Sequence, residues 1–163
     1  MSPPHQGQVY EVPEGVKEIS DSAFSSGVDT VVLPDSIENI GYMNVKNIQV
    51  KDTNEWFFSS DGVLFSKGDT ELVAYPAGRT ETEYTVPEGV TAIGTGAFIR
   101  CDSLVKINMP HTLELVSHQA IGDCSNLEEV VFETIPEFEI AVNDSIVDFE
   151  VPPKIKIIFI DDQ

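Results

Sequence analysis

Positive charge is scarce in this sequence, and that scarcity restricts the partners the protein can bind. Its 163 residues include 9 Lys and Arg against 28 Asp and Glu, so the formal net charge is −19. Affinity for nucleic acid or for an anionic membrane surface depends largely on Lys and Arg side chains that neutralise phosphates. We therefore exclude nucleic acid as a principal ligand.

Long apolar runs are also absent. The longest candidate, residues 155–160, is interrupted by Lys156, whereas a membrane-spanning helix needs about 20 apolar residues. We therefore expect no membrane insertion by this segment. The first six residues contain neither the basic nor the apolar region of an export signal, so the protein is either intracellular or a mature form without its signal.

Cysteine and histidine are few, and neither forms a recognisable chemical motif. The two cysteines, Cys101 and Cys124, cannot build the disulfide framework of a small secreted domain. The three histidines lie outside any metal-binding motif, and no Gly-x-Ser-x-Gly sequence surrounds a serine. We expect no enzyme activity, no cofactor and no metal site.

The sequence does contain an internal repeat. Residues 10–24 and 84–98 are identical at nine of fifteen positions, with a constant offset of 74. Within the second copy a shorter period appears, because seven matched pairs, such as Pro87 and Pro110, lie 23 residues apart. A period of this length is typical of leucine-rich repeats, which span about 20–29 residues. It predicts a solenoid in which each coil buries one face against its neighbours.

Each coil is expected to combine a short strand with a tight turn. In the segment 104–109 the apolar positions alternate, so Ile107 and Met109 point inward while Lys106 and Asn108 point outward. Pro110 then ends the strand because it cannot donate to a ladder. The turn that follows the second apolar pair has room for one helical turn only. Because Cys101 and Cys124 occupy equivalent places in adjacent coils, we expect two stacked, reduced thiols.

The motif carried by residues 87–107, I/V-P-x-x-V-x-x-I-G-x-x-A-F-x-x-C-x-x-L-x-x-I, resembles the BspA-type leucine-rich repeat. The resemblance covers about residues 9–132 and implies a leucine-rich-repeat solenoid of the α/β horseshoe class, dominated by β-structure with short single-turn helices. It implies four or five coils, and a bacterial or protozoan secreted or cell-surface protein that adheres to host matrix proteins or to other cells. The motif fails in residues 34–50, where the Ala-Phe turn is missing and the coil is shortened.

We expect a single domain, residues 1–163, with coils at about 9–50 and 84–132. The intervening insert, 51–83, contains Asp61-Gly62 between two apolar runs, which is typical of a type I′ hairpin turn. Residues 72–76 would add a third strand to an antiparallel meander. The tail, 133–163, shows no repeat, and its strand-like stretches 138–142 and 155–160 predict an irregular C-terminal cap.

Two surfaces are candidates for binding a protein partner. The aromatic residues Trp56, Phe57 and Phe58 form either an exposed platform or a cluster packed against the neighbouring coils. The second surface is the outward face of the stacked strands, which solenoids commonly use for binding. Its candidate residues are Lys46, Asn47, Gln49, Lys106, Asn108, Glu128 and Glu129. Because this face lacks aromatic side chains and arginine, an ordinary solvated sheet is the alternative.

The absence of any catalytic motif, together with what the resemblance implies, leads us to expect a non-catalytic, extracellular or cell-surface module for protein–protein interaction or adhesion. Its partner would be a host matrix protein or another cell-surface protein. The alternative is a structural spacer that presents neighbouring segments and has no ligand of its own.

Overall fold

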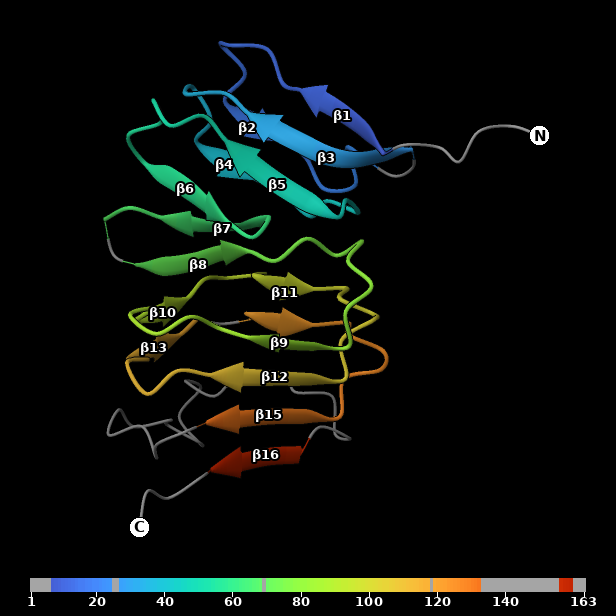
Figure 1. The fold of residues 1–163 in the computed structure, drawn as a ribbon, viewed down its shortest axis with the longest axis vertical. Helices are drawn as coiled ribbons and strands as arrows, with labels where there is room; N and C mark the ends of the chain where they lie inside the picture. Colours follow the sequence, from blue (N-terminus) through green and yellow to red (C-terminus); the bar gives the residue numbers. More distant parts are fainter. Residues whose placement is uncertain (1–6, 25–26, 69, 118, 133–155, 160–163) are drawn as a thin grey trace, which may run out of the picture.

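The computed structural model describes residues 7–24, 27–68, 70–117, 119–132 and, for the backbone, 156–159. Within these residues the chain forms short β-strands joined by turns, and no helix is present. Successive strands lie one above another along the long axis of the molecule (Figure 1). This arrangement confirms the predicted solenoid.

The N-terminal coils form a parallel sheet with the strand order β1-β3-β5. Its strands are β1 (Gln8–Glu11), β3 (Val28–Leu33) and β5 (Asn47–Val50). The step from β3 to β5 is short, because the paired residues Thr30 and Asn47 are only 17 residues apart. Two short strands of the same coils, β2 (Glu18–Ile19) and β4 (Asn39–Ile40), pair in parallel as a second small sheet.

The C-terminal coils form a second parallel sheet with the order β16-β15-β12-β9. Its strands are β9 (Glu83–Thr85), β12 (Lys106–Met109), β15 (Glu129–Phe132) and β16 (Lys156–Phe159). The paired residues Thr85 and Asn108 are 23 residues apart, which confirms the predicted period. The expectation of a non-repeating tail is wrong for β16, which pairs in register with β15 and adds a further rung to the ladder. Residues 138–142 lie outside the described residues.

The insert forms the predicted antiparallel meander from β6 (Phe57–Ser60), β7 (Val63–Ser66) and β8 (Glu71–Ala74). Asp61 and Gly62 both have positive φ angles, 50° and 75°, as a type I′ turn requires. The sheet does not end at the meander, because β8 pairs in parallel with β10 (Ala92–Ile93), and β10 pairs with β13 (Leu115–Val116).

The turns of the C-terminal coils are shorter than the single-turn helices expected. The N–H of Ala97 donates to the carbonyl of Gly94 at 3.1 Å, and Ala120 bonds to Ser117 at the same distance. Each of these hydrogen-bonded turns leads directly into a two-residue strand. These strands are β11 (Phe98–Ile99) and β14 (Ile121–Gly122), which pair in parallel.

Two hydrophobic cores lie inside the solenoid, and the meander separates them. Leu64 of β7 packs in the N-terminal core with Val31 and Ile48. Its neighbours along the strand, Val63 and Phe65, pack in the C-terminal core. Because successive side chains of a strand point to opposite faces, β7 contributes to both cores. The parallel strands of the coils therefore form two separate sheets, with the meander between them (Figure 1).

Equivalent residues of successive coils stack inside the cores. Phe98 is fully buried in the C-terminal core, while Phe24 is half-buried against the N-terminal core.

Cys101 and Cys124 are free thiols, both buried, and the Cys124 thiol donates to the carbonyl of Phe98 at 3.1 Å. A hydrogen bond with Cys124 and burial together raise the pKa of Cys101. The predicted pair of stacked, reduced cysteines is confirmed.

A recurrent hydroxyl bridge fixes the spacing between coils. The Thr112 hydroxyl accepts the N–H of Gly89 at 3.0 Å and donates to the carbonyl of Val90 at 2.9 Å. Ser36 makes the same pair of bonds to the Gly15 and Val16 backbone of the preceding coil. Satisfying backbone groups between coils with one small side chain stabilises their stacking.

Candidate protein-binding surfaces

Trp56 is the most exposed large hydrophobic residue described, with 67% of its surface accessible. Its backbone is nevertheless fixed. The N–H of Trp56 donates to Oδ1 of Asn54 at 2.9 Å, and its carbonyl accepts the N–H of Lys67 at 2.8 Å. Asn54 is itself fully buried and donates through Nδ2 to the carbonyl of Pro34 at 3.2 Å. A rigid backbone therefore presents an exposed indole.

The other two aromatic residues of the predicted platform are placed differently. Phe57 points inward and packs against the N-terminal core. Phe58 lies on the opposite side of β6, is 36% exposed, and stacks on Phe65 with ring centroids 5.3 Å apart. The structure therefore leaves Trp56, which precedes β6, and Phe58 exposed, and packs Phe57 away from solvent.

The predicted outward residues of the N-terminal sheet lie along β5 and the turn before it. The ammonium group of Lys46 lies 3.3 Å from the Asp29 carboxylate. Asn47 donates to the Thr30 hydroxyl at 3.4 Å, and Gln49 is exposed. Asn47 and Gln49 alternate with the buried Ile48 and so share one face of β5.

The predicted outward residues of the C-terminal sheet lie on β12 and β15. Asn108 donates to the Glu83 carboxylate at 2.8 Å, and the Lys106 ammonium lies 4.0 Å from that carboxylate. Glu129 pairs in register with Lys106, and Glu128 precedes it in an exposed position. The N- and C-terminal sets belong to different sheets, so the seven polar residues do not form one face.

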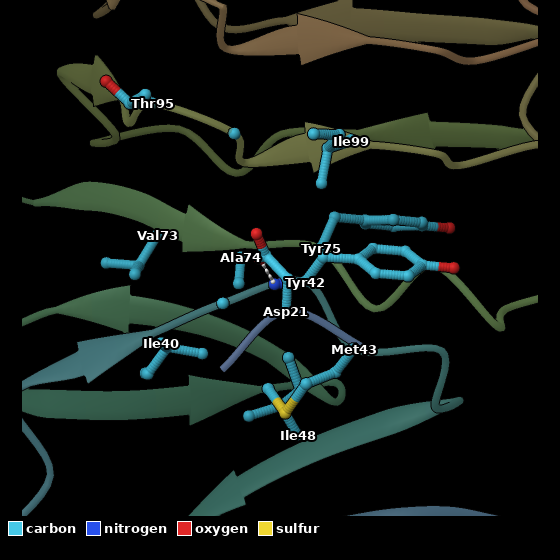
Figure 2. Close-up of a pocket in the computed structure, with 12 residues that line it drawn as sticks. Asp21, Ile40, Tyr42, Met43, Ile48, Val73, Ala74, Tyr75, Thr95 and Ile99 are labelled. Atoms are coloured by element: carbon cyan, nitrogen blue, oxygen red, sulfur yellow. Dashed lines mark hydrogen bonds between the residues drawn. The ribbon is translucent and has the colours of Figure 1, made fainter. Parts of the chain in front are cut away.

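Sequence reasoning missed a pocket at the junction between the two halves (Figure 2). Its volume is about 130 Å³. Six of the twelve lining residues are apolar and non-aromatic, and the others are two tyrosines, two glycines, one aspartate and one exposed threonine. The lining residues are Asp21, Ile40, Gly41, Tyr42, Met43, Ile48, Val73, Ala74, Tyr75, Thr95, Gly96 and Ile99. The one available signal was the shortened coil of residues 34–50.

A metal centre finds no support in the described part of the chain. Among the described residues no three His, Cys, Asp or Glu side chains converge as ligands. His111 forms an ion-pair contact with Glu88, with Nδ1 2.8 Å from the carboxylate. His5 and His118 lie outside the described residues. None of the described elements is a helix long and apolar enough to cross a membrane.

Comparison with known proteins supports the architecture. Six copies of the BspA type leucine rich repeat region match residues 8–57 and 78–160, so the repeats exceed the four or five coils expected. A leucine-rich repeat protein from Eubacterium ventriosum shares 23% identity and a TM-score of 0.54, over 78% of this chain and 43% of that one. This likeness confirms the leucine-rich-repeat fold.

Two further solved structures are similar at lower scores. The pneumococcal vaccine antigen PcpA shares 19% identity and a TM-score of 0.47, over 78% of this chain and 51% of that one. A leucine rich cell surface protein from Faecalibacterium prausnitzii shares 19% identity and a TM-score of 0.45, over 95% of this chain and 60% of that one. The chain therefore spans less than two thirds of each of these proteins. No curated protein matches it.

Proposed function

The chain belongs to the family of proteins with BspA-type leucine-rich repeats, and from that membership we propose that it is a non-catalytic, extracellular or cell-surface module that binds other proteins. Coils that stack in register expose one row of side chains per strand that the core does not require. Such rows supply extended binding surfaces in solenoid proteins.

The observation that carries this proposal is the exposed indole of Trp56 on a fixed backbone. Tryptophan is enriched among the few residues that dominate binding energy at protein interfaces. Because the Asn54 and Lys67 bonds already hold the Trp56 backbone, little backbone conformational entropy would be lost when a partner covers the indole. Phe58, two residues further along the chain on β6, is also exposed.

The polar outward residues would form the rim of the interface. Lys46, Asn47 and Gln49 lie on β5 and the turn before it, and the hairpin is joined to this strand because Ile48 donates to the carbonyl of Gly62 at 2.8 Å. Rim residues contribute hydrogen bonds and specificity more than affinity. The set Lys106, Asn108, Glu128 and Glu129 would serve a separate contact on the C-terminal sheet.

Binding of the whole chain to immobilised extracellular-matrix proteins, measured by surface plasmon resonance, tests this proposal. We expect Trp56→Ala to weaken binding at least tenfold, since hot-spot truncations cost about 2 kcal/mol or more. Leu115→Ala is the matched control, because Leu115 is also a large exposed hydrophobic residue, 53% accessible, on β13. Its affinity should equal that of the unaltered chain.

Equal binding by the Trp56→Ala variant and the unaltered chain would contradict the role of the indole. If the unaltered chain bound none of the immobilised proteins, the adhesion role would fail and the structural spacer would be the better account.

A further inference from the structure

The first copy of the repeat is more exposed than the second at equivalent positions, which lie 74 residues apart. Phe98 is fully buried, whereas its equivalent Phe24 is only half-buried. Tyr84 is partly buried against the C-terminal core, whereas its equivalent Tyr10 is 46% exposed. Two further pairs differ in the same direction: Val90 and Val16, and Ala97 and Ala23. The second copy therefore has a cover that the described residues do not supply for the first.

The cover of the second copy is the meander strand β8, which pairs in parallel with β10. The N–H of Gly94, just after β10, donates to the carbonyl of Leu72 in β8 at 2.9 Å. The N–H of Tyr75, just after β8, donates to the carbonyl of Ala97 at 2.8 Å. One extended segment thus closes both the strand edge and the turn of this copy.

The Tyr75 ring completes an aromatic cluster in the second copy. Its centroid lies 4.8 Å from that of Tyr84 and 5.4 Å from that of Phe98. In the first copy the rings of Tyr10 and Phe24 contact each other, with centroids 5.4 Å apart. No third ring among the described residues lies against this pair. The first copy thus has the two rings that Tyr75 covers in the second.

β2 is the equivalent of β10 and has one unpaired edge. Its other edge pairs with β4, since the carbonyl of Ile19 accepts the N–H of the residue after β4 at 2.7 Å. The next residue, Ser20, directs its N–H to the opposite edge. This N–H corresponds to that of Gly94, and the Ala23 carbonyl corresponds to that of Ala97. Neither the Ser20 N–H nor the Ala23 carbonyl bonds to a described residue. β1 and β2 lie at one end of the stack, where an extended segment can reach this edge (Figure 1).

Two substitutions in the first copy change what the edge of β2 accepts. Glu18 takes the place of Ala92, which pairs with Glu71 of β8. Because Glu18 is exposed, it would repel a second carboxylate at the place of Glu71 and attract a lysine there. Ser20 takes the place of Gly94, where an added Cβ would meet a Glu71 carboxylate oxygen but stay 3.3 Å from the nearest backbone atom. The edge therefore disfavours a glutamate and still admits the backbone of a strand.

We propose that this end of the solenoid binds an extended segment of a partner protein that carries the sequence Lys-Leu-x-x-Tyr. This spacing is that of β8 and the residue after it, with lysine in place of the first residue of β8. The segment would pair in parallel with β2, so that its lysine lies beside Glu18 and its tyrosine covers Tyr10 and Phe24. Added strands of this kind bind through main-chain hydrogen bonds and gain specificity from their side chains. The net charge of −19 favours a basic partner over an acidic one.

This site goes beyond the proposed function, because neither Trp56 nor the outward sheet residues contribute to it. A short peptide is enough to test it, so its failure would leave the matrix-protein experiment unaffected.

The experiment is a titration of the isotope-labelled whole chain with the peptide acetyl-Thr-Lys-Leu-Thr-Ala-Tyr-Pro-amide, followed by the backbone amide signals in two-dimensional NMR. We expect saturable shifts at Tyr10, Ile19, Ser20 and Phe24. We expect none at Phe98, because Tyr75 already covers its ring. A peptide with alanine in place of tyrosine should bind about tenfold more weakly, since it loses the contact with both rings.

Tyr10→Ala removes one of the two rings from an exposed position and should weaken binding of the tyrosine peptide about tenfold. Trp56→Ala is the matched control, since Trp56 is also an exposed aromatic residue but belongs to the meander. Its affinity for the peptide should equal that of the unaltered chain.

Glu18→Gln tests the charge of the site. It should weaken binding of the peptide about threefold, which is the size of effect expected for an exposed ion pair. Glu114→Gln is the matched control, because Glu114 is also an exposed carboxylate but lies in the C-terminal coils. It should bind like the unaltered chain.

Shifts that do not cluster at this end, equal affinity for the alanine peptide, or undiminished binding by Tyr10→Ala would each overturn the proposal. Equal weakening by Glu18→Gln and Glu114→Gln would also overturn it, since this would show general attraction between opposite charges rather than a site. Concentration-dependent shifts at the same residues without peptide would assign this end to a second copy of the chain instead of a partner protein.

Discussion

Arg79 joins the hairpin to the coil that follows it. Its side chain is only 9% exposed, and its guanidinium donates to both oxygens of the Glu81 carboxylate, at 3.3 and 3.1 Å. It also donates to the backbone carbonyl of Asp61 in the hairpin turn and lies 5.5 Å from the centroid of the Tyr75 ring. One nearly buried cation thus connects the turn, the end of the meander and the next coil.

Arg79→Ala should lower the free energy of unfolding by about 2 kcal/mol, since it removes several hydrogen bonds to charged and backbone groups. Urea unfolding followed by circular dichroism measures this change. Lys17→Ala is the control, because the Lys17–Glu38 pair, 2.9 Å apart, is more than half exposed on both sides and such pairs contribute little. A loss equal to that of the control would contradict the anchoring role of Arg79.

The difference in unfolding free energy between the unaltered chain and Arg79→Ala should depend on pH. The hydrogen bond from Arg79 lowers the pKa of Glu81 in the folded chain. A carboxyl group with a depressed folded pKa stabilises the fold above its unfolded pKa and loses that contribution as pH falls through the folded value. The difference in stability between the unaltered chain and Arg79→Ala should therefore shrink below about pH 4. A difference that is constant from about pH 7 to about pH 3 would be inconsistent with this coupling.

At the scale of single elements, the meander is the part that holds the two cores together. Leu64 faces one core, and Val63 and Phe65 face the other. The hairpin turn at its tip lies directly against β5, where an added Cβ on Gly62 would approach Oδ1 of Asn47 to 2.4 Å. The geometry of this turn therefore controls how the meander sits on the N-terminal coils.

Gly62→Ala should cost about 2 kcal/mol of stability, because it combines a clash with a left-handed backbone at φ +75°. Gly68→Ala is the matched control within the same insert, since nothing lies within 4 Å of its added Cβ and its φ is not positive. Thermal unfolding of both variants measures this difference in stability. Similar melting temperatures for the two variants would contradict the close seating of the turn.

The meander also shows what local sequence can and cannot predict. The Asp61-Gly62 turn was predictable because its backbone requirement is local. The orientation of β6 was not, since each of its faces carries one phenylalanine and one serine. Only the packed structure shows that Phe57 is turned inward while Trp56 and Phe58 are exposed. The parallel pairing of β8 with β10 was also out of reach, because it joins an insert to a repeat with no shared motif.

At the scale of the whole molecule, the number of residues between paired strands differs from coil to coil. It is the same from β9 to β12 as from β12 to β15, and it is smaller from β3 to β5. This difference accounts for both the regular C-terminal coils and the irregular junction. The regular period of the C-terminal coils was visible in the sequence, so the stacking of Cys101 on Cys124 was predictable. The shortened coil of residues 34–50 was also visible, but the pocket was not. Its size depends on how much of the junction Tyr75 fills from the distant meander.

The outward candidate residues illustrate the same limit. Repeat alignment assigns Asn47 and Asn108 equivalent positions, and the structure places each of them on the outer side of its own sheet. The meander nevertheless separates the two sheets, so equivalence in the repeat does not make the residues neighbours in space. A partner that spans both sheets must therefore cross the meander, where Trp56 is exposed.

The central claim is that successive coils lie in register with equivalent residues in contact. Nuclear Overhauser effects between methyl groups test it most directly. We predict strong cross-peaks between Ile107 and Val130 and between Val31 and Ile48, which pair in register, and none between Val31 and Ile107, which lie in different cores. Loss of either expected cross-peak, or a direct contact between Val31 and Ile107, would contradict the stacked solenoid.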